Sequence, residues 1–258
     1  MAQVITIKDL SIGYSSKHKI RTVASSINAT LQDSELTCLI GCNGIGKSTL
    51  LRTLIGFQQP LAGEIIIKDK SLSDYTSLEL AKMIGIVLTT KIDAKALSVE
   101  EIVGIGRSPY TGFFGALSST DNNIVAEAIR QVGIEYLAHR NISELSDGER
   151  QKVMIAKALA QQTPIIILDE PTSFLDFPSK VEVFRKLRQL AHEQQKTILL
   201  STHDVELSIQ LSDRLWLMES NHLAIGTPKE LAMNGSLSHF IERDGIRFNK
   251  ENLKIEID

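Results

Sequence analysis

The feature that most constrains this chain is a glycine-rich segment that reads G-x-x-x-x-G-K-S from residue 41. The apolar run Leu36 to Ile40 precedes it with strand character, and Ser48 to Ile55 suits a helix that stops at Gly56. In that setting the glycines let the backbone curl until several N–H groups point at phosphate oxygens, and the helix N-terminus adds its positive end. Lys47 would reach the β- and γ-phosphates of a nucleotide, and the Ser48 hydroxyl would be a ligand of Mg²⁺. We therefore predict a phosphate-binding loop made of Gly41, Cys42, Asn43, Gly44, Ile45, Gly46, Lys47, Ser48 and Thr49.

Composition and charge argue against several classes of protein. The 28 Lys and Arg are slightly outnumbered by 31 Asp and Glu, and they form no basic run, which disfavours a nucleic-acid partner. No apolar run approaches the roughly 20 residues of a membrane-spanning helix, and the first residues lack the pattern of a secretory signal. Cys38 and Cys42 lie in a predicted strand and in the loop, where a disulfide would distort the loop, so we expect reduced, cytosolic thiols.

Apolar alternation predicts an antiparallel β layer near the N-terminus. Val4 to Lys8 alternates with period two, and Gly63 to Ile67 is a further short strand after a turn. The stretch from residue 23 to residue 31 alternates as well, and one face of that strand should carry Val23, Ser25, Ile27, Ala29 and Leu31.

From Ser98 onward the pattern changes to helices. Ser98 and Glu101 fit a capping box, and the apolar residues between 124 and 132 indicate a helix that ends at Gly133. The segment 107–119 is rich in glycine, proline and aromatic residues, so we predict a loop there. The helix after Glu149 is apolar on nearly all sides and should be buried.

The second half of the chain alternates strand and helix patterns. Two short apolar runs, Ile165 to Leu168 and Thr197 to Ser201, are separated by a helical pattern, which is typical of a parallel sheet covered on both faces. Thr227 and Pro228 fit the start of a further helix. The tail after Asp244 is polar and carries no clear pattern.

Two carboxylates follow one of these buried strands. Asp169 and Glu170 would lie at the C-terminal edge of the sheet, where ligands bind in open α/β sheets. Acidic residues also follow strands in ordinary turns, and it is the phosphate loop elsewhere in the chain that favours a functional interpretation. Asp169 would then hold Mg²⁺, and Glu170 would polarise an attacking water.

The segment Leu145-Ser146-Asp147-Gly148-Glu149 precedes the helix that should be buried. Ser146 and Glu149 fit a capping box, and the N-terminus of a helix is also a suitable anion site. At this point the motifs resemble those of the ATPase subunit of ATP-binding cassette (ABC) transporters over nearly the whole chain. In that family the Leu-Ser-Gly-Gly-Gln signature of one subunit closes over ATP held by the phosphate loop of the other. Ser146 and Gly148 stand at the matching positions.

Further residues match the family one by one. Residues 170–176 are similar to the end of the Walker B motif and the D-loop, which implies that Asp176 crosses the dimer interface. His203 resembles the switch histidine that contacts the γ-phosphate, although a lone histidine after a strand is usually structural. Tyr14 matches the aromatic residue that stacks on adenine, although alone it would more often be an ordinary packing residue. The resemblance thus implies a catalytic set of Lys47, Glu170 and His203.

The resemblance also implies a fold and a domain organisation. We expect an α/β P-loop NTPase of the RecA-like type, with a parallel-sheet core, an N-terminal antiparallel β layer and an inserted α-helical subdomain. Residues 1–258 would form a single ABC ATPase domain. Residues 1–88 and 160–258 would form its catalytic core, and residues 89–159 would form the helical subdomain with the signature motif.

Two departures from the family pattern involve three positions. The family places a glutamine that binds Mg²⁺ after the strand corresponding to residues 84–88, and Thr89 stands there. A threonine hydroxyl is a shorter ligand that a water molecule can extend, so the expected metal ligands are Ser48, Asp169 and Thr89. Asp147 and Glu149 replace a glycine and the glutamine of the signature, and their charge near a γ-phosphate is unfavourable unless both side chains turn away.

Residues 99–110 are similar to a segment of importers of iron chelates, in which Gly-Arg-x-Pro followed by an aromatic residue is typical. Those importers handle ferric siderophores, haem and vitamin B12. An importer of zinc or manganese is the nearest alternative, and a soluble ABC-type nucleotide switch with little hydrolysis is another. ABC-type ATPases that act on DNA or ribosomes usually carry long heptad arms or two cassettes, which this chain lacks.

The resemblance implies cofactors and partners as well. We expect ATP and Mg²⁺ to bind, and two copies of the chain to form a head-to-tail homodimer. The dimer would work with two transmembrane permease subunits and indirectly with a substrate-binding protein, without nucleic acid. The segment from Thr89 to about Tyr110 would transmit the ATP cycle to the permease. The chain would be peripheral, at the cytoplasmic face of the inner (plasma) membrane.

Overall fold

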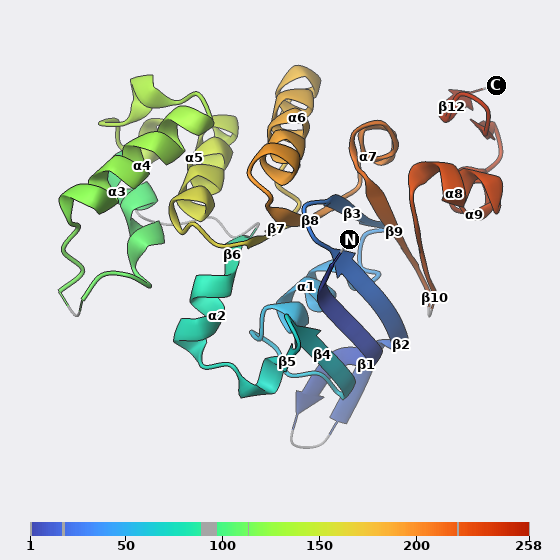
Figure 1. Ribbon diagram of the computed structural model, residues 1–258. Helices are drawn as coiled ribbons and strands as arrows, with labels where there is room; N and C mark the ends of the chain where they lie inside the picture. Colours follow the sequence, from blue (N-terminus) through green and yellow to red (C-terminus); the bar gives the residue numbers. More distant parts are fainter. Residues whose placement is uncertain (1, 17–18, 89–96, 113, 221, 258) are drawn as a thin grey trace. The chain divides into compact units, whose positions relative to one another are not determined.

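The computed structural model describes residues 2–16, 19–88, 97–112, 114–220 and 222–257. The chain forms two compact units, of which the first contains residues 1–75 and 187–258 and the second contains residues 76–186. Each unit has its own strands and helices, which Figure 1 labels. Both predicted limits of the helical subdomain, residues 89 and 159, fall within the second unit. No helix within the described ranges is long and apolar enough to cross a membrane.

An antiparallel sheet opens the first unit, as predicted. Its long central strand buries Ile5, Ile7, Leu10 and Ile12, and these form the core between this sheet and the helix that follows the phosphate loop. In the order of pairing, the strands are β2 (Lys19–Gln32), β1 (Gln3–Ser16), β4 (Ala62–Ile67) and β5 (Lys70–Ser71).

Strand β2 departs from the predicted alternation at Ser26. Residues 27, 29 and 31 are buried as predicted, but Ala24 is buried in place of Val23 and Ser25. Ser26 has a φ of 54°, and the register against β1 shifts at this point. A bulge adds one residue to the strand, so side chains before it point to the opposite face. The prediction that Val23 and Ser25 share a face with Ile27 is therefore wrong.

The remaining sheet strands of the first unit surround β3 (Leu36–Gly41), in the order β10-β9-β3-β8. Strands β8 (Thr197–Thr202) and β9 (Arg214–Glu219) run parallel to β3, and both β3 and β8 are buried along their length, as predicted. Strand β10 (His222–Gly226) pairs antiparallel with β9 and gives the sheet a mixed edge that was not predicted. The apolar run from Leu215 to Met218 was the sequence signal for this hairpin.

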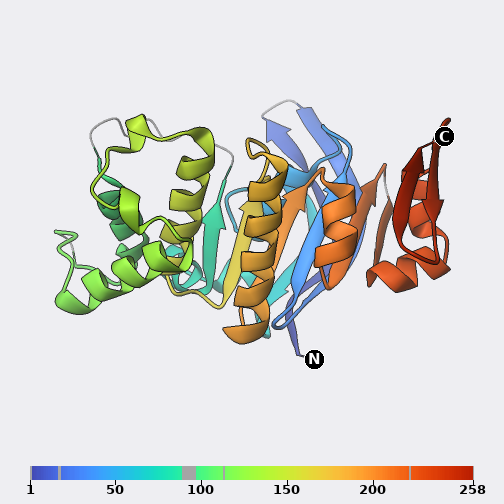
Figure 2. The ribbon, with the colours of Figure 1, turned by 90° about the horizontal axis from the view of Figure 1, so that it is seen from above.

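Helices cover these strands and complete the unit. Helix α1 (Lys47–Leu54) contacts both β1 and β3, and α7 (Val205–Leu211) follows β8. The C-terminal elements lie together at one end of the unit, as Figure 2 shows. They include a hairpin in the tail for which no structure was predicted, and Phe248 is its buried anchor. These elements are α8 (Pro228–Met233), α9 (Ser236–Ile241), β11 (Ile246–Asn249) and β12 (Lys254–Ile257).

The second unit combines a parallel strand pair with a helical cluster. Strand β6 (Ile84–Val87) runs parallel to β7 (Ile165–Asp169). Helices α3, α4 and α5 pack on one another, and each begins with a serine capping box. The helices are α2 (Ser77–Met83), α3 (Val99–Gly104), α4 (Ser119–Gln131), α5 (Asp147–Ala160) and the first part of α6 (Phe177–Glu193).

A buried ion pair fixes the helical cluster. Arg107, which was predicted to begin a loop, instead ends a short 3-10 helix and is only 5% exposed. Its Nε donates to Oδ1 of Asp121 at 2.8 Å, and its guanidinium also donates to the carbonyl oxygen of Ala160 at 2.8 Å. Arg107 thus ties the start of α4 to the C-terminal end of α5.

Candidate nucleotide-binding site

The phosphate loop joins β3 to α1 in the predicted strand–loop–helix arrangement. Gly44 and Gly46 adopt φ values of 81° and 117°, which L side chains rarely adopt. A Cβ on Gly46 would lie 2.5 Å from Cγ1 of Val23, the residue that the bulge in β2 turns away from the face of Ile27. The bulge therefore packs the Val23 side chain against the loop, so only glycine fits at position 46.

Lys47 is held within the loop. Its side chain is buried, and Nζ donates to the carbonyl oxygen of Gly41 at 2.8 Å. The carbonyl oxygen of Cys42 lies 3.5 Å from the same ammonium group. The positive charge therefore lies at the centre of the loop, where phosphate oxygens would exchange with these carbonyl groups.

Tyr14 lies at the first turn of α1. Its hydroxyl and Oγ1 of Thr49 are 3.1 Å apart and form a hydrogen bond. Half of the Tyr14 side chain is exposed, so an aromatic surface is available beside the phosphate loop. This arrangement is compatible with base stacking on Tyr14, which remains a prediction.

His203 lies at the same edge of the sheet as the loop. Strands β3 and β8 are parallel and pair Ile40 with Thr202, so the phosphate loop that continues from Gly41 and His203 that follows Thr202 lie at the same end of the two strands. His203 is exposed. The first unit thus brings together the phosphate loop, Tyr14 and His203, which lie far apart in sequence.

The second unit presents the two predicted carboxylates at the end of β7. Asp169 is 3% exposed, and Glu170 directly follows it with a φ of 48°. Both the backbone N–H and the hydroxyl of Ser173 donate to the Glu170 carbonyl oxygen, at 3.3 and 3.1 Å. Such an unfavourable backbone conformation is often found where a side chain must be held in a functional position.

The signature segment forms the N-terminus of α5. Ser146 accepts from the backbone N–H of Glu149 and donates to its carboxylate, which confirms the capping box. The hydroxyl and the backbone N–H of Ser146 both donate to the Glu149 carboxylate and hold its pKa below the usual value. Asp147 instead pairs with Arg150 at 3.0 Å. Both acidic side chains are thus engaged by partners within the chain.

Asp176 lies at the start of α6. Its Oδ1 accepts from the backbone N–H of Ser179 at 3.2 Å, and its side chain is exposed. Hydrogen bonds from Ser179 lower the pKa of this carboxyl, so it is ionised at neutral pH. A charged, exposed group at this position is available to a second protein chain.

The expected metal ligands fit Mg²⁺ by their chemistry. Ser48 offers a hydroxyl and Asp169 a buried carboxylate, and hard cations such as Mg²⁺ prefer oxygen ligands together with waters and substrate phosphates. The third expected ligand, Thr89, lies outside the described residues.

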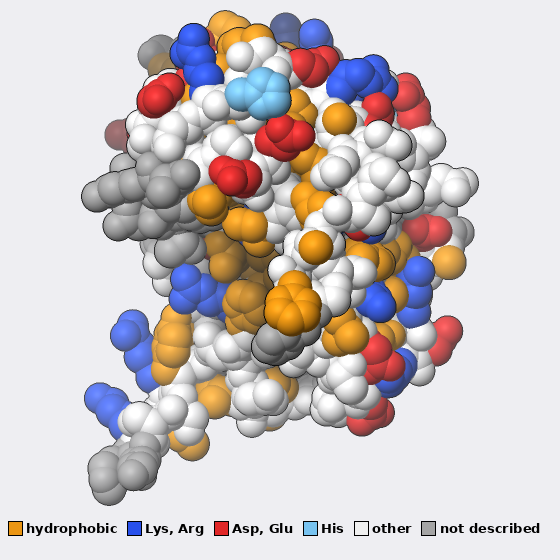
Figure 3. Space-filling view, turned by 90° about the vertical axis from the view of Figure 1, so that its left-hand side faces the viewer, with side chains coloured by type: hydrophobic (Ala, Val, Ile, Leu, Met, Phe, Trp, Pro, Cys, Tyr) orange, Lys and Arg blue, Asp and Glu red, His pale blue; other side chains and the backbone are white. Residues whose placement is uncertain are grey.

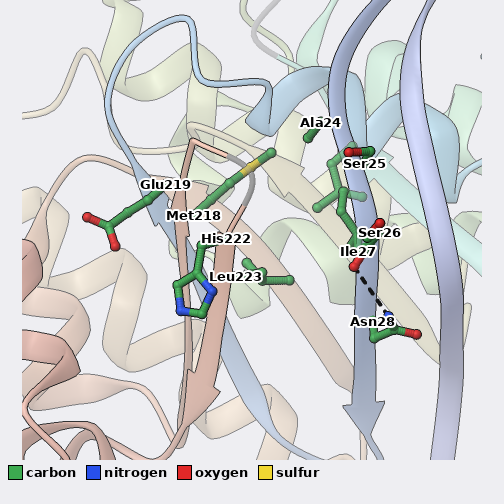
Figure 4. A pocket seen from close by; sticks show the side chains of 10 residues that line it. Ala24, Ser25, Ser26, Ile27, Asn28, Met218, Glu219, His222 and Leu223 are labelled. Carbon is green, nitrogen blue, oxygen red and sulfur yellow. Dashed lines mark hydrogen bonds between the residues drawn. The ribbon is translucent and has the colours of Figure 1, made fainter.

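A cavity of about 160 Å³ lies beside the loop, between β2 and the β9–β10 hairpin. Figure 4 shows Met218 and Leu223 facing Ile27 across it. None of residues 41–49 lines this cavity. The phosphate loop is therefore not part of this cavity.

Comparison with known proteins decides the family. The family model described as ABC transporter matches residues 24–173, which include the phosphate loop, the signature segment and the β7 carboxylates. The chain belongs to the ABC transporter family. It therefore carries the ATPase domain of this family and binds ATP, as predicted.

Relatives and solved structures agree with this assignment. The ATP-binding protein MJ0873 of an ABC transporter from Methanocaldococcus jannaschii is 40% identical over 88% of this chain and 78% of that protein. The ferric enterobactin transport ATP-binding protein FepC of Escherichia coli is 34% identical over 87% of this chain and 82% of that protein. These matches confirm the predicted ATP-binding subunit of an ABC transporter, with iron-chelate relatives.

Two solved structures confirm the predicted ABC cassette fold. A metal-chelate type ABC transporter in an inward-facing conformation has a TM-score of 0.80 and 27% identity, with 100% of this chain and 97% of that chain covered. A dimeric, post-hydrolysis cassette bound to ADP and Pi, MJ0796, has a TM-score of 0.77 and 26% identity, with 87% and 98% covered.

Sequence reasoning missed the residues that support the site. The hydrogen bond between Thr49 and Tyr14 joins positions 35 residues apart, and a glutamine after α1, Gln58, contacts the residue before Tyr14. Arg107 was predicted to begin a loop and was noted as part of a family-like segment, but its partner Asp121 was not identified. Sequence spacing carries no signal for such long-range pairs.

Proposed function

We propose that this chain hydrolyses ATP to power the uptake of an iron chelate, such as a siderophore, haem or cobalamin, through membrane partners. The observation that carries the proposal is the similarity to the ferric enterobactin transport protein over most of both chains. Similarity over the whole chain to a metal-chelate type transporter supports the same substrate class. The Gly-Arg-x-Pro segment that ends near Tyr110 agrees with it.

The proposed mechanism uses the residues of both units. The phosphate loop and Lys47 bind the triphosphate, and His203 holds the γ-phosphate. Glu170 polarises a water molecule, which attacks the γ-phosphorus while the bond to the ADP oxygen breaks, so that ADP and inorganic phosphate leave. Mg²⁺ held by Ser48 and Asp169 would neutralise charge on the phosphate oxygens.

A second copy of the chain completes the proposed site. Gly148 at the N-terminus of α5 would offer its N–H to the γ-phosphate of ATP on the partner, and the Ser146 hydroxyl would exchange its hydrogen bond to the Glu149 carboxylate for one to that phosphate. Asp176 is exposed and ionised, as expected for a group that crosses the interface. The dimeric arrangement of the related cassette supports this head-to-tail homodimer.

The second unit offers a surface for the permease. Its exposed hydrophobic residues include Leu78, Ile105, Tyr110 and Phe114, and Figure 3 shows hydrophobic side chains gathered in the middle of one face of the molecule. Exposed apolar patches of this kind are typical of protein interfaces. The segment from Thr89 to Tyr110 would contact two permease subunits at the cytoplasmic face of the membrane, and these would receive substrate from a binding protein.

Uptake measurements test the substrate class. Cells that lack the native gene receive the parent, Glu170→Gln, or the exposed control Glu251→Gln. Accumulation of radiolabelled ferric siderophores, haem, cobalamin, zinc and manganese is then compared. We expect the parent and the control to restore uptake of an iron chelate, and Glu170→Gln to restore at least tenfold less because it lacks the general base. Restored uptake of zinc or manganese alone would contradict the proposal.

A further inference from the structure

The end of β1 that carries Tyr14 pairs with a neighbouring strand on one side only. On one side β1 still pairs with β2, through Gly13 with Thr22 and Tyr14 with Arg21. On the other side, pairing with β4 ends at Ser11, which lies opposite Ala62. The carbonyl oxygen of Gly13 therefore lies beyond the last β4 pair and needs a donor from elsewhere.

Gln58 supplies that donor. Its Nε2 donates to the carbonyl oxygen of Gly13, and its side chain is partly buried. The backbone of Gln58 is itself anchored, because its N–H donates to the carbonyl oxygen of Arg52 in α1 at 3.2 Å. Gly56, with a φ of 75°, makes the turn that brings the chain back to this point. The amide of Gln58 thus replaces a strand neighbour for the segment before Tyr14.

The helix of the phosphate loop consequently holds the Tyr14 segment at two points. Thr49, in the first turn of α1, forms the hydrogen bond with the Tyr14 hydroxyl. Gln58, just past the last turn, holds the preceding carbonyl group. Only glycine fits at position 13, since a Cβ there would lie 2.1 Å from the carbonyl oxygen of Arg21. Tyr14 is therefore fixed relative to the phosphate loop before any nucleotide arrives.

We propose that Gln58 is a positioning residue for the nucleotide base: it holds Tyr14 in place beside the phosphate loop. This inference rests on the proposed stacking of adenine on Tyr14. A platform that is already in place loses less conformational freedom when the base binds, so the two hydrogen bonds contribute to affinity without touching ATP. Gln58 should matter for a ligand with a base and should not matter for a bare triphosphate.

Equilibrium binding by the full chain tests the proposal. The non-hydrolysable β,γ-imido analogue of ATP and inorganic triphosphate are each titrated in the presence of Mg²⁺. Gln58→Met keeps the side-chain volume and removes the hydrogen bond. We expect it to weaken the analogue roughly threefold to tenfold, the range for one hydrogen bond, and to change triphosphate binding less than about twofold. Gln59→Met, an exposed neighbour, is the matched control and should bind both ligands as the parent does.

A double-mutant cycle separates positioning from general damage. In a Tyr14→Ala background, Gln58→Met should have no further effect on the analogue, because Gln58 acts through Tyr14. The inference is overturned if Gln58→Met leaves analogue binding unchanged, weakens both ligands equally, or has its full effect without Tyr14. It is also overturned if Tyr14→Ala itself binds the analogue normally. These titrations need no hydrolysis or transport, so failure of the proposed transport function would leave their outcome readable.

Discussion

Cys38 and Cys42 are four residues apart, but Cys38 is buried and Cys42 is exposed. Burial raises the pKa of the Cys38 thiol to about 12, although hydrogen bonds from Ser208 and Ser212 oppose the change. Cys42 is an exposed free thiol in the phosphate loop. The thiolate is the reactive form of cysteine. At about pH 7.5–8 the native protein should therefore have one reactive thiol, and the denatured protein should have two.

This difference predicts that ATP protects the protein from alkylation. Iodoacetamide should label Cys42 and not Cys38, and saturating ATP should slow the labelling at least about threefold by covering the loop. Peptide mass spectrometry measures both sites, and Cys42→Ser is the control that should lose the fast label. Labelling of Cys38 in native protein would contradict its burial in β3, and no protection by ATP would contradict the place of Cys42 in the nucleotide site.

At the residue scale, the residues of the candidate site could be predicted from the sequence. The residues that hold them in place could not. The phosphate loop, the β7 carboxylates and the signature segment are local motifs whose chemistry depends on short spacing. The ion pair of Asp147 with Arg150 was not predicted; the expectation was only that the Asp147 side chain turns away from a bound phosphate. Tyr14, by contrast, depends on Thr49 and on a distant glutamine. Such pairs form only when the fold brings their elements together.

At the element scale, helices and strands with strong apolar periodicity were predicted correctly. Features that depend on tertiary contacts could not be predicted. The helix after Glu149 and the strand before Asp169 were predicted because their apolar patterns are unambiguous. The bulge at Ser26 was not, because a positive φ at a serine has no sequence signal and the face of the strand changes with it. The C-terminal hairpin is largely polar and has few buried residues beyond Phe248, so alternation could not reveal it.

The Arg107–Asp121 pair makes the stability of the helical cluster depend on pH. Hydrogen bonds from Ser118 and Arg107 lower the pKa of Asp121 from 3.8 to about 2. Because the folded pKa lies below the unfolded one, the unfolded chain binds more protons between these values. The stabilising contribution is therefore complete above about pH 4 and is lost as the pH falls toward 2.

Asp121→Asn tests this contribution. The variant keeps a capping side chain and leaves the buried Arg107 without its charge partner, so its thermal midpoint at pH 7 should fall by roughly 3–8 °C. Its stability should also vary less than that of the parent between pH 4 and pH 2. The exposed control Asp244→Asn should follow the parent. Equal pH profiles for the parent and Asp121→Asn by thermal unfolding would refute the assignment.

At the scale of the whole molecule, the residues of the proposed site come from two compact units and two copies of the chain. The loop, Tyr14 and His203 belong to the first unit, and the signature serine and the β7 carboxylates belong to the second. Family membership and the cassette fold were predictable because each motif is local and their order along the chain is specific. A single chain does not display the assembly of two copies, so that prediction rests on the family resemblance.

ATP-dependent dimerisation of Glu170→Gln tests the central claim most directly. The variant retains the groups that bind ATP but lacks the proposed base, so turnover should fall at least about 100-fold and the ATP-bound dimer should accumulate. Light scattering with ATP and Mg²⁺ should then show a dimer for Glu170→Gln, a monomer when ATP is left out, and parent behaviour for Glu251→Gln. A Glu170→Gln protein that hydrolyses ATP as fast as the parent and forms no ATP-dependent dimer would contradict the account.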